Sequence, residues 1–277
     1  MAEEIMATPR WLFQWIGWSG LVLSLLFAAA QNANTGAPSQ PRMATGGLVS
    51  SLLAAPVVGQ PYSAVQVHGT TRTLADGSTV SHHGHHVVAR DAEGRVHVEM
   101  RMANGRNGEP DQVMVFVMDP VAHTLTTWLS NVPNQPKVAS LIKMPAPGKD
   151  ASPAPAEKNP AEDHRPQPII TTEDLGAKTI QGLETTGKRT TTIVPVGRSG
   201  NSAPITKTYE VWTSADMGLV VKQVWTDPRY GERTVELKDL TRVAPDAALF
   251  RPPAGYTVKD AVESLRELEQ KLEANME

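Results

Sequence analysis

Histidines are concentrated in one stretch of the chain, residues 78–100, which reads STVSHHGHHVVARDAEGRVHVEM. Five of the eight histidines lie in it. Neutral imidazoles together with carboxylates are common ligands of zinc and similar divalent ions, and an unperturbed imidazole titrates at about pH 6.5. The stretch is therefore a candidate metal site or pH-responsive surface, and the alternative is a polar strand face in contact with solvent.

The register of the two expected strands decides which of these side chains meet. The strands flank DAEG, residues 91–94, whose composition is typical of a four-residue turn. A turn of that length pairs Val88 with His97 and His86 with Glu99, and side chains on one face of a pair come within reach of each other. The candidate metal ligands are then His82, His86, His97 and Glu99.

The rest of the sequence lacks the familiar patterns of catalysis. It contains no cysteine, which excludes disulfides and thiol chemistry. It has no G-x-S-x-G elbow, phosphate-binding loop or dinucleotide-binding glycine motif. A net charge of −3 provides no basic surface for nucleic acid. We therefore predict a protein that is not an enzyme, uses no cofactor and binds no nucleic acid.

The N-terminus has the pattern of an export signal. From Trp11 to Ala30 the chain carries no charged residue; Arg10 precedes this segment and three alanines close it. A basic residue, an apolar stretch and an A-x-A ending are typical of a secretory signal. Residues 1–30 thus predict export to the periplasm or cell envelope. The alternative is a permanent anchor in the inner membrane, since about twenty apolar residues can span a bilayer.

Residues 61–257 have the pattern of a single β domain. Apolar and polar residues alternate in short runs that are separated by turn sequences such as DPRYG. This pattern predicts a mainly β fold with an antiparallel sheet of about nine to ten strands. Residues 31–60 predict a flexible spacer, and the proline-rich residues 131–168 predict a disordered insertion into the domain.

Residues 258–277 predict a C-terminal amphipathic α-helix. Thr257 and Asp260 resemble a capping box at its start. Apolar residues at three-to-four spacing form one stripe: Val258, Val262, Leu265, Leu268, Leu272 and Met276. The stripe favours a helix docked on the sheet, and the alternatives are pairing with a second copy or lying on a membrane.

The second half of the domain resembles a family of exported bacterial proteins to which no activity is attached. The resemblance rests on TTEDLGAKTIQGLETTGKRTT (171–191), YEVWTSADMGLVVKQVWTDPRYGE (209–232) and PDAALFRPPAGYTV (245–258). More remotely, a strand ending in Trp212, a turn with Asp216 and a following strand to Trp225 resemble the lipoprotein-carrier half-barrel superfamily. That resemblance implies a curved antiparallel sheet that wraps a helix, with a lipid or acyl group on its concave side.

Together these observations predict a non-catalytic module that binds an apolar, lipid-like ligand or a protein partner in the cell envelope. A half-open sheet has to cover its concave apolar face with something. One alternative is a metal- or pH-sensing module that uses the face of His82 to His97, and another is a membrane-anchored envelope regulatory domain. The predicted ligand-lining residues, each also a candidate for plain core, are Val65, Val67, Val87, Val98, Val115, Val117, Trp212, Val224 and Val235.

Overall fold

The computed structural model describes residues 57–102, 111–130, 136–144 and 166–274. The predicted export segment and the predicted spacer up to residue 56 lie outside these ranges, as does much of the proline-rich insertion. Export, anchoring and the flexible spacer therefore stay predictions. Within the described ranges, no helix is both long enough and apolar enough to cross a membrane.

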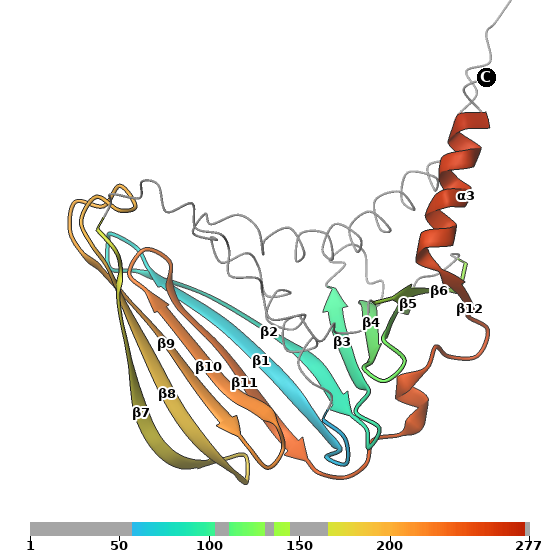
Figure 1. Ribbon diagram of the computed structural model, residues 1–277, viewed down its shortest axis with the longest axis horizontal. Coiled ribbons are helices and arrows are strands. Elements are labelled where there is room, and N and C mark those ends of the chain that lie inside the picture. The colour runs from blue at the N-terminus through green and yellow to red at the C-terminus, as the bar shows by residue number, and fades with distance from the viewer. Residues whose placement is uncertain (1–56, 103–110, 131–135, 145–165, 275–277) are drawn as a thin grey trace, which may run out of the picture.

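The described residues form one sheet of twelve strands followed by a helix (Figure 1). The strands are β1 (Tyr62–Thr73), β2 (Thr79–Arg90), β3 (Val96–Met102), β4 (Gln112–Asp119), β5 (Thr124–Ser130), β6 (Val138–Lys143), β7 (Ile169–Ile180), β8 (Leu183–Val194), β9 (Ile205–Ser214), β10 (Leu219–Asp227), β11 (Gly231–Thr241) and β12 (Thr257–Asp260). A 3-10 helix, η1 (Ala247–Phe250), lies between β11 and β12, and α3 (Ala261–Ala274) ends the described chain.

The sheet is built from two meanders that meet in its middle. Its order is β12-β6-β5-β4-β3-β2-β1-β11-β10-β9-β8-β7, so β1 pairs with the late strand β11. All neighbours are antiparallel except β12 and β6. The sheet curves strongly between its two ends (Figure 1). The prediction of a mainly β, curved antiparallel sheet with a C-terminal helix is confirmed.

Three strands depart from the predicted boundaries. β6 lies inside the insertion that we predicted to be disordered, and its alternation buries Ala139 and Ile142. After the insertion, the alternating pattern predicts the next strand only from Thr179, but β7 begins ten residues earlier, at Ile169, and forms a long hairpin with β8 through Gln181 and Gly182. Both turn residues have positive φ, 50° and 74°, as the tight turns of two-residue hairpins require.

The third departure is β12, which replaces the predicted start of the helix. Thr257 and Val258 pair with β6, and α3 begins only at Ala261. Asp260 is the capping residue, because its Oδ1 accepts hydrogen bonds from the backbone N–H of Val262 at 3.0 Å and of Glu263 at 3.4 Å. Val258 and Val262 are 51% and 45% exposed, so this part of the predicted apolar stripe is not docked.

Strand pairing divides the side chains between two faces of the sheet. The inner face carries Val98, Phe116 and Val235, and the outer face carries His97 and Val115. The outer face of β3–β6 is covered by residues 242–256, here called the strap, which contains η1 (Figure 1). The core under the strap consists of Ala89, Val113, Val115, Val117, Trp128, Ala139 and Phe250.

A second core cluster joins the inner face of the central strands to the β9–β10 turn and to Ile180, Leu183 and Trp212 on the outer face of β7–β9. Met217 in that turn is fully buried. Its backbone carbonyl accepts a hydrogen bond from Nη2 of the buried Arg90 at 2.6 Å. The cluster consists of Tyr62, Ala64, Val88, Val98, Ile180, Leu183, Trp212, Met217, Val221 and Leu237.

Replacing Gly187 by alanine should destabilise the domain. An added Cβ would lie 2.8–2.9 Å from three ring atoms of Trp212, and this ring is held by its Nε1, which donates to Glu210 Oε1 at 2.6 Å. We expect Gly187→Ala to lower the free energy of unfolding by about 1–3 kcal/mol in urea titrations. Lys188→Ala, at the exposed neighbouring position, should stay within about 0.5 kcal/mol. Equal stability of wild type and Gly187→Ala would contradict this packing.

Candidate ligand-binding face

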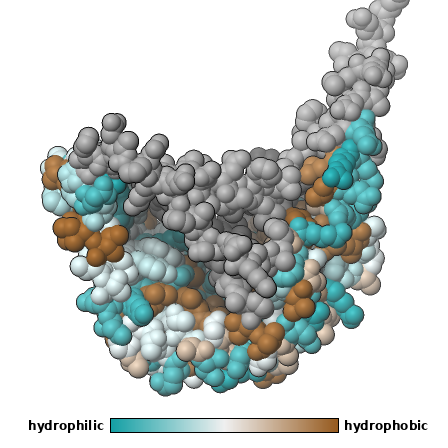
Figure 2. All heavy atoms as spheres, in the orientation of Figure 1, coloured by the Kyte–Doolittle hydropathy of each residue, from teal (hydrophilic) through white to brown (hydrophobic). Residues whose placement is uncertain are grey.

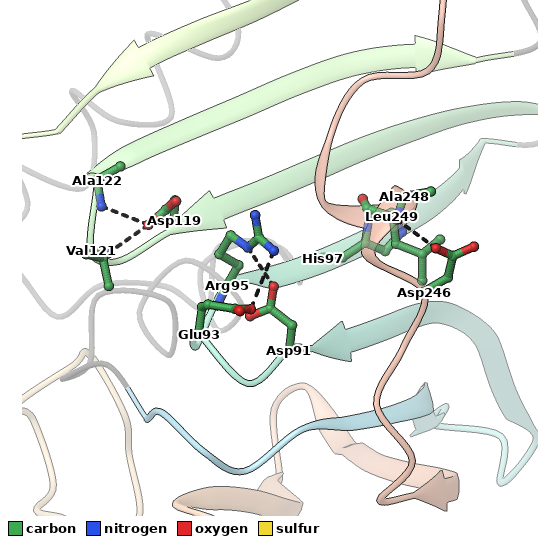
Figure 3. A network of polar contacts seen from close by, with 10 residues as sticks. All are labelled: Asp91, Glu93, Arg95, His97, Asp119, Val121, Ala122, Asp246, Ala248 and Leu249. Atoms are coloured by element: carbon green, nitrogen blue, oxygen red, sulfur yellow. Dashed lines mark hydrogen bonds and ion pairs between the residues drawn. The ribbon is translucent and has the colours of Figure 1, made fainter.

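The β2–β3 turn differs by one residue from the predicted register. Asp91 and Arg95 close it, with the N–H of Asp91 donating to the carbonyl of Arg95 at 3.1 Å and the N–H of Arg95 donating to Asp91 Oδ1 at 2.8 Å. Arg95 Nε also donates to Asp91 Oδ2 at 2.6 Å (Figure 3). Gly94 has φ of 86°. The loop thus has three residues and ends in a left-handed glycine, a common hairpin geometry.

This shift separates the predicted metal ligands. His86 pairs with Met100 instead of Glu99, and His97 pairs with Ala89 instead of Val88. His86 and His82 therefore lie on the inner face, whereas His97 and Glu99 lie on the outer face. Within the described ranges, no three histidine, cysteine, aspartate or glutamate side chains are grouped so that they could hold a metal ion. The predicted set does not assemble.

His97 has a structural place beneath the strap. It is 2% exposed, and its Nδ1 donates to the carbonyl oxygen of Leu249 at 2.7 Å, while Nε2 lies 3.1 Å from Glu99 Oε1. Its ring meets that of Phe250 edge-on, with centroids 6.2 Å apart. Figure 3 shows His97 beside Leu249. His97 therefore fixes η1 on the outer face.

Most of the predicted ligand-lining residues lie on the outer face. Val98 and Val235 lie on the inner face. The outer face carries Val65, Val67, Val87, Val115, Val117, Trp212 and Val224. Val115 and Val117 are core beneath the strap, and Trp212 packs on Gly187. The prediction named all nine as candidates for the concave apolar face, whereas strand pairing distributes them over both faces.

The inner face instead carries a patch of flexible apolar side chains, here called the methionine patch: Met100, Met114, Phe116 and Leu129. Met100 pairs with Met114, and Met114 pairs with Leu129, so these three form one row across β3, β4 and β5. Phe116 lies beside the row, opposite Val98. All four are half-buried. Methionine is unbranched and polarisable, so such a surface adapts to irregular apolar shapes.

Two histidines extend this surface beyond Met100: His86 on β2 and His68 on β1. His86 is the cross-strand neighbour of Met100, and its ring lies 4.7 Å from that of His68 on β1, measured between centroids. Gly84 makes room for His68, because a Cβ there would lie 2.3 Å from His68 Nε2. The Nδ1 atoms of both rings are buried and have no hydrogen-bond partner among the described residues.

Burial keeps these two imidazoles neutral. Desolvation, together with smaller contributions from the nearby His68 and His85, lowers the pKa of His86 to about 4. Desolvation also lowers the pKa of His68, with smaller contributions from Arg233 and His85. The effect of Arg233 on His68 agrees with the strand pairing, which makes them diagonal neighbours on the inner face.

Aromatic and polar side chains of β9–β11 complete the inner face. Arg233 lies over the ring of Trp225, 5.0 Å from its centroid. Trp225 stacks on Tyr209 at 5.2 Å, and Tyr209 Oη accepts a hydrogen bond from Gln223 Nε2 at 2.8 Å. The inner face thus has an apolar side on β3–β5 and a polar, aromatic side on β1 and β9–β11, with the histidine pair between them.

Sequence reasoning missed His68, Arg233 and the methionine patch. Met100 and Met102 on β3, and Met114, Phe116 and Met118 on β4, are spaced by two, so period-two alternation could have identified them as one face. His68 and Arg233 have no such signal. They meet only because β1 pairs with β11, at a sequence separation that no local pattern reveals.

In the view of Figure 2, hydrophobic residues lie as separate patches among polar ones. No family model and no curated protein matches the chain. Among solved structures, the chain is similar to a chain of the complex of MucB with MucA(peri), at 14% identity and a TM-score of 0.35, over 76% of this chain and 60% of that one. This chain thus spans less than two thirds of the length of its match.

The chain is also similar to two further solved structures. The Mycobacterium tuberculosis lipoprotein LppX matches at 13% identity and a TM-score of 0.29, over 68% of this chain and 90% of LppX. A LolA superfamily protein from Nitrosomonas europaea matches at 10% identity and a TM-score of 0.27, over 74% of this chain and 96% of that one. At these values the similarities say nothing of a ligand, a partner or an activity.

The histidine pair should make stability depend on pH. The folded protein holds His86 with a pKa of about 4, below the ordinary value of about 6.5, so the unfolded chain binds more protons between these values. The stability from neutral His86 is complete above about pH 6.5 and is lost as the pH falls towards 4, by up to about 3 kcal/mol. Urea unfolding measured between these pH values should show this loss.

Besides each other, His86 and His68 are affected by the charges of His85 and Arg233. A variant that tests His86 should therefore replace His86 and leave these other groups in place. We expect His86→Gln to flatten the pH dependence, and the exposed His83→Gln to leave it as in wild type. An equally steep loss of stability in His86→Gln would show that other groups cause it.

Proposed function

We propose that this protein is a non-catalytic, exported binding module that holds an apolar, lipid-like ligand on the inner face of its sheet. The observation that carries the proposal is the methionine patch. Its four large side chains share the inner face of the sheet, opposite the strap, and are half-buried. Among the described elements, η1 packs on the opposite face and α3 leaves the sheet at β12, so neither lies over the patch (Figure 1).

The chemistry of the patch fits an acyl chain better than a rigid ligand. Unbranched methionine side chains adjust to a partner without a fixed shape. Burying apolar surface yields about 25 cal/mol per Å², so an extended chain lying along the row of Met100, Met114 and Leu129 would be held without directional bonds. The outer face offers no equivalent, because the strap already covers its apolar residues on β3–β6.

Two clusters of charged groups on the described sheet have structural roles that fit a non-catalytic protein. Asp227 accepts hydrogen bonds from Arg229, which with the nearby Lys207 hold the pKa of Asp227 at about 2. Arg189 bridges Glu173 at 2.8 Å and Glu210 at 3.0 Å. These carboxylates are already neutralised by cations, which leaves them unsuited to abstract or donate a proton at neutral pH.

Binding of a neutral apolar dye tests this proposal. N-phenylnaphthylamine should fluoresce on the purified wild-type protein and be displaced by oleoylglycerol. The double variant Met100→Gln and Met114→Gln should bind both about tenfold more weakly, because a side-chain amide in apolar contact costs about 1–3 kcal/mol.

The control variant is Lys222→Gln on the outer face, where Lys222 pairs with Trp212 and Glu236. It should bind dye and oleoylglycerol as wild type does, and both variants should unfold cooperatively. Absence of dye binding by wild type, or equal affinity of the double methionine variant, would refute a ligand on the inner face.

A further inference from the structure

Arg233 is a cation on the inner face for which the described residues provide no counter-ion. It pairs across the sheet with Thr70 and Trp225, and desolvation lowers its pKa. The described interactions of its side chain are the contact with the Trp225 ring and the charge effect on His68; among the described residues, no ion pair or hydrogen bond is found for the guanidinium. Asp227, two residues further along the neighbouring strand, is held by Arg229 at 2.9 Å and Lys207 at 3.4 Å.

The histidine pair adds unsatisfied polar atoms to the same place. His86 is 7% exposed, and its buried Nδ1, like that of His68, lacks a partner in the described part of the chain. A buried polar nitrogen without a partner destabilises the fold, and a desolvated cation without an anion does so more strongly. Two imidazoles and a guanidinium that face the same region are a favourable set for a bound anion, since each can donate a hydrogen bond to it.

The proposed anion-binding groups lie directly beside the methionine patch. His86 is the direct neighbour of Met100, and the row continues to Met114 and Leu129. Three strand spacings separate the ends of this row, roughly 14 Å, which suits a long acyl chain. A molecule that satisfies both sides of the inner face has an anionic head and an apolar tail.

We propose that Arg233, His68 and His86 form the headgroup site of an anionic lipid, whose acyl chain lies along the methionine patch. This inference rests on the proposed function and assigns the class of its ligand. The guanidinium of Arg233 supplies the charge and a two-pronged donor set that fits a phosphate or carboxylate. Gly84 belongs to the site as well, because only a residue without a Cβ lets the His68 ring lie over β2.

Two lipids with the same chain test the inference. Oleoyl lysophosphatidylglycerol carries a phosphate that oleoylglycerol lacks, and both can be titrated against bound N-phenylnaphthylamine at pH 7. We expect wild type to bind the anionic lipid at least about tenfold more tightly. Arg233→Gln should weaken the anionic lipid by about ten- to a hundredfold and change the affinity for oleoylglycerol by less than about twofold.

Arg189→Gln is the matched control, because it removes an arginine from the outer face of β8, where Arg189 faces Glu210. It should keep the wild-type preference for the anionic lipid. Arg233→Lys, which retains the charge, should keep part of the preference and gives a second readout if Arg233→Gln lowers the unfolding midpoint.

The outcomes separate this inference from the function on which it rests. If both lipids displace the dye equally well from wild type, or if Arg233→Gln retains the preference, the headgroup site is refuted while an apolar binding face stands. If neither lipid displaces the dye, the proposed function fails. Glycerol phosphate, a headgroup without a chain, should not compete at the concentrations at which the lipid does; equal competition would make this a site for free phosphate and overturn the lipid.

Discussion

The closure of the β2–β3 turn by Asp91 and Arg95 is the interaction on which the two faces of this sheet depend. One backbone–side-chain hydrogen bond, one backbone–backbone hydrogen bond and one ion pair between these two residues fix the loop at three residues. Because side chains alternate across a strand, this single choice decides the face of every residue in β3 relative to β2. It places His86 beside the methionine patch and His97 beneath the strap.

The two faces differ in how their apolar side chains are covered. The outer face of β3–β6 is closed by the chain itself: Phe250 is buried against it, His97 holds the carbonyl of Leu249, and Tyr256 donates to the carbonyl of Leu129 at 2.7 Å. On the inner face, Val88, Val98 and Leu237 are buried core, whereas the methionine patch is half-buried and the histidine pair carries polar atoms without partners among the described residues. The outer face of β3–β6 is thus closed by the strap, and the proposed ligand contacts lie on the inner face.

Much of the architecture could be read from local patterns. Alternation and turn composition predicted the strands between residues 61 and 130 and between 205 and 241, and they predicted a terminal helix. Short strands next to unusual composition were missed: β6 adjoins a proline-rich stretch, and β12 was absorbed into the helix that follows it. The candidate site was predicted less well than the strands, because its residues come from strands as distant in sequence as β1 and β11.

By itself, the sequence determined that this chain forms an antiparallel sheet with two chemically distinct faces, because apolar and polar residues alternate along its strands. It also determined that thiol chemistry is absent. Only the tertiary structure decided which residues share a face. A shift of one residue in the pairing of two strands leaves the alternation within each strand unchanged, but it moves every side chain of one strand to the opposite face. The pairing of β1 with β11 is a long-range contact that no local pattern reveals. Register and pairing are properties of the folded sheet, and they alone bring His68, His86 and Arg233 together.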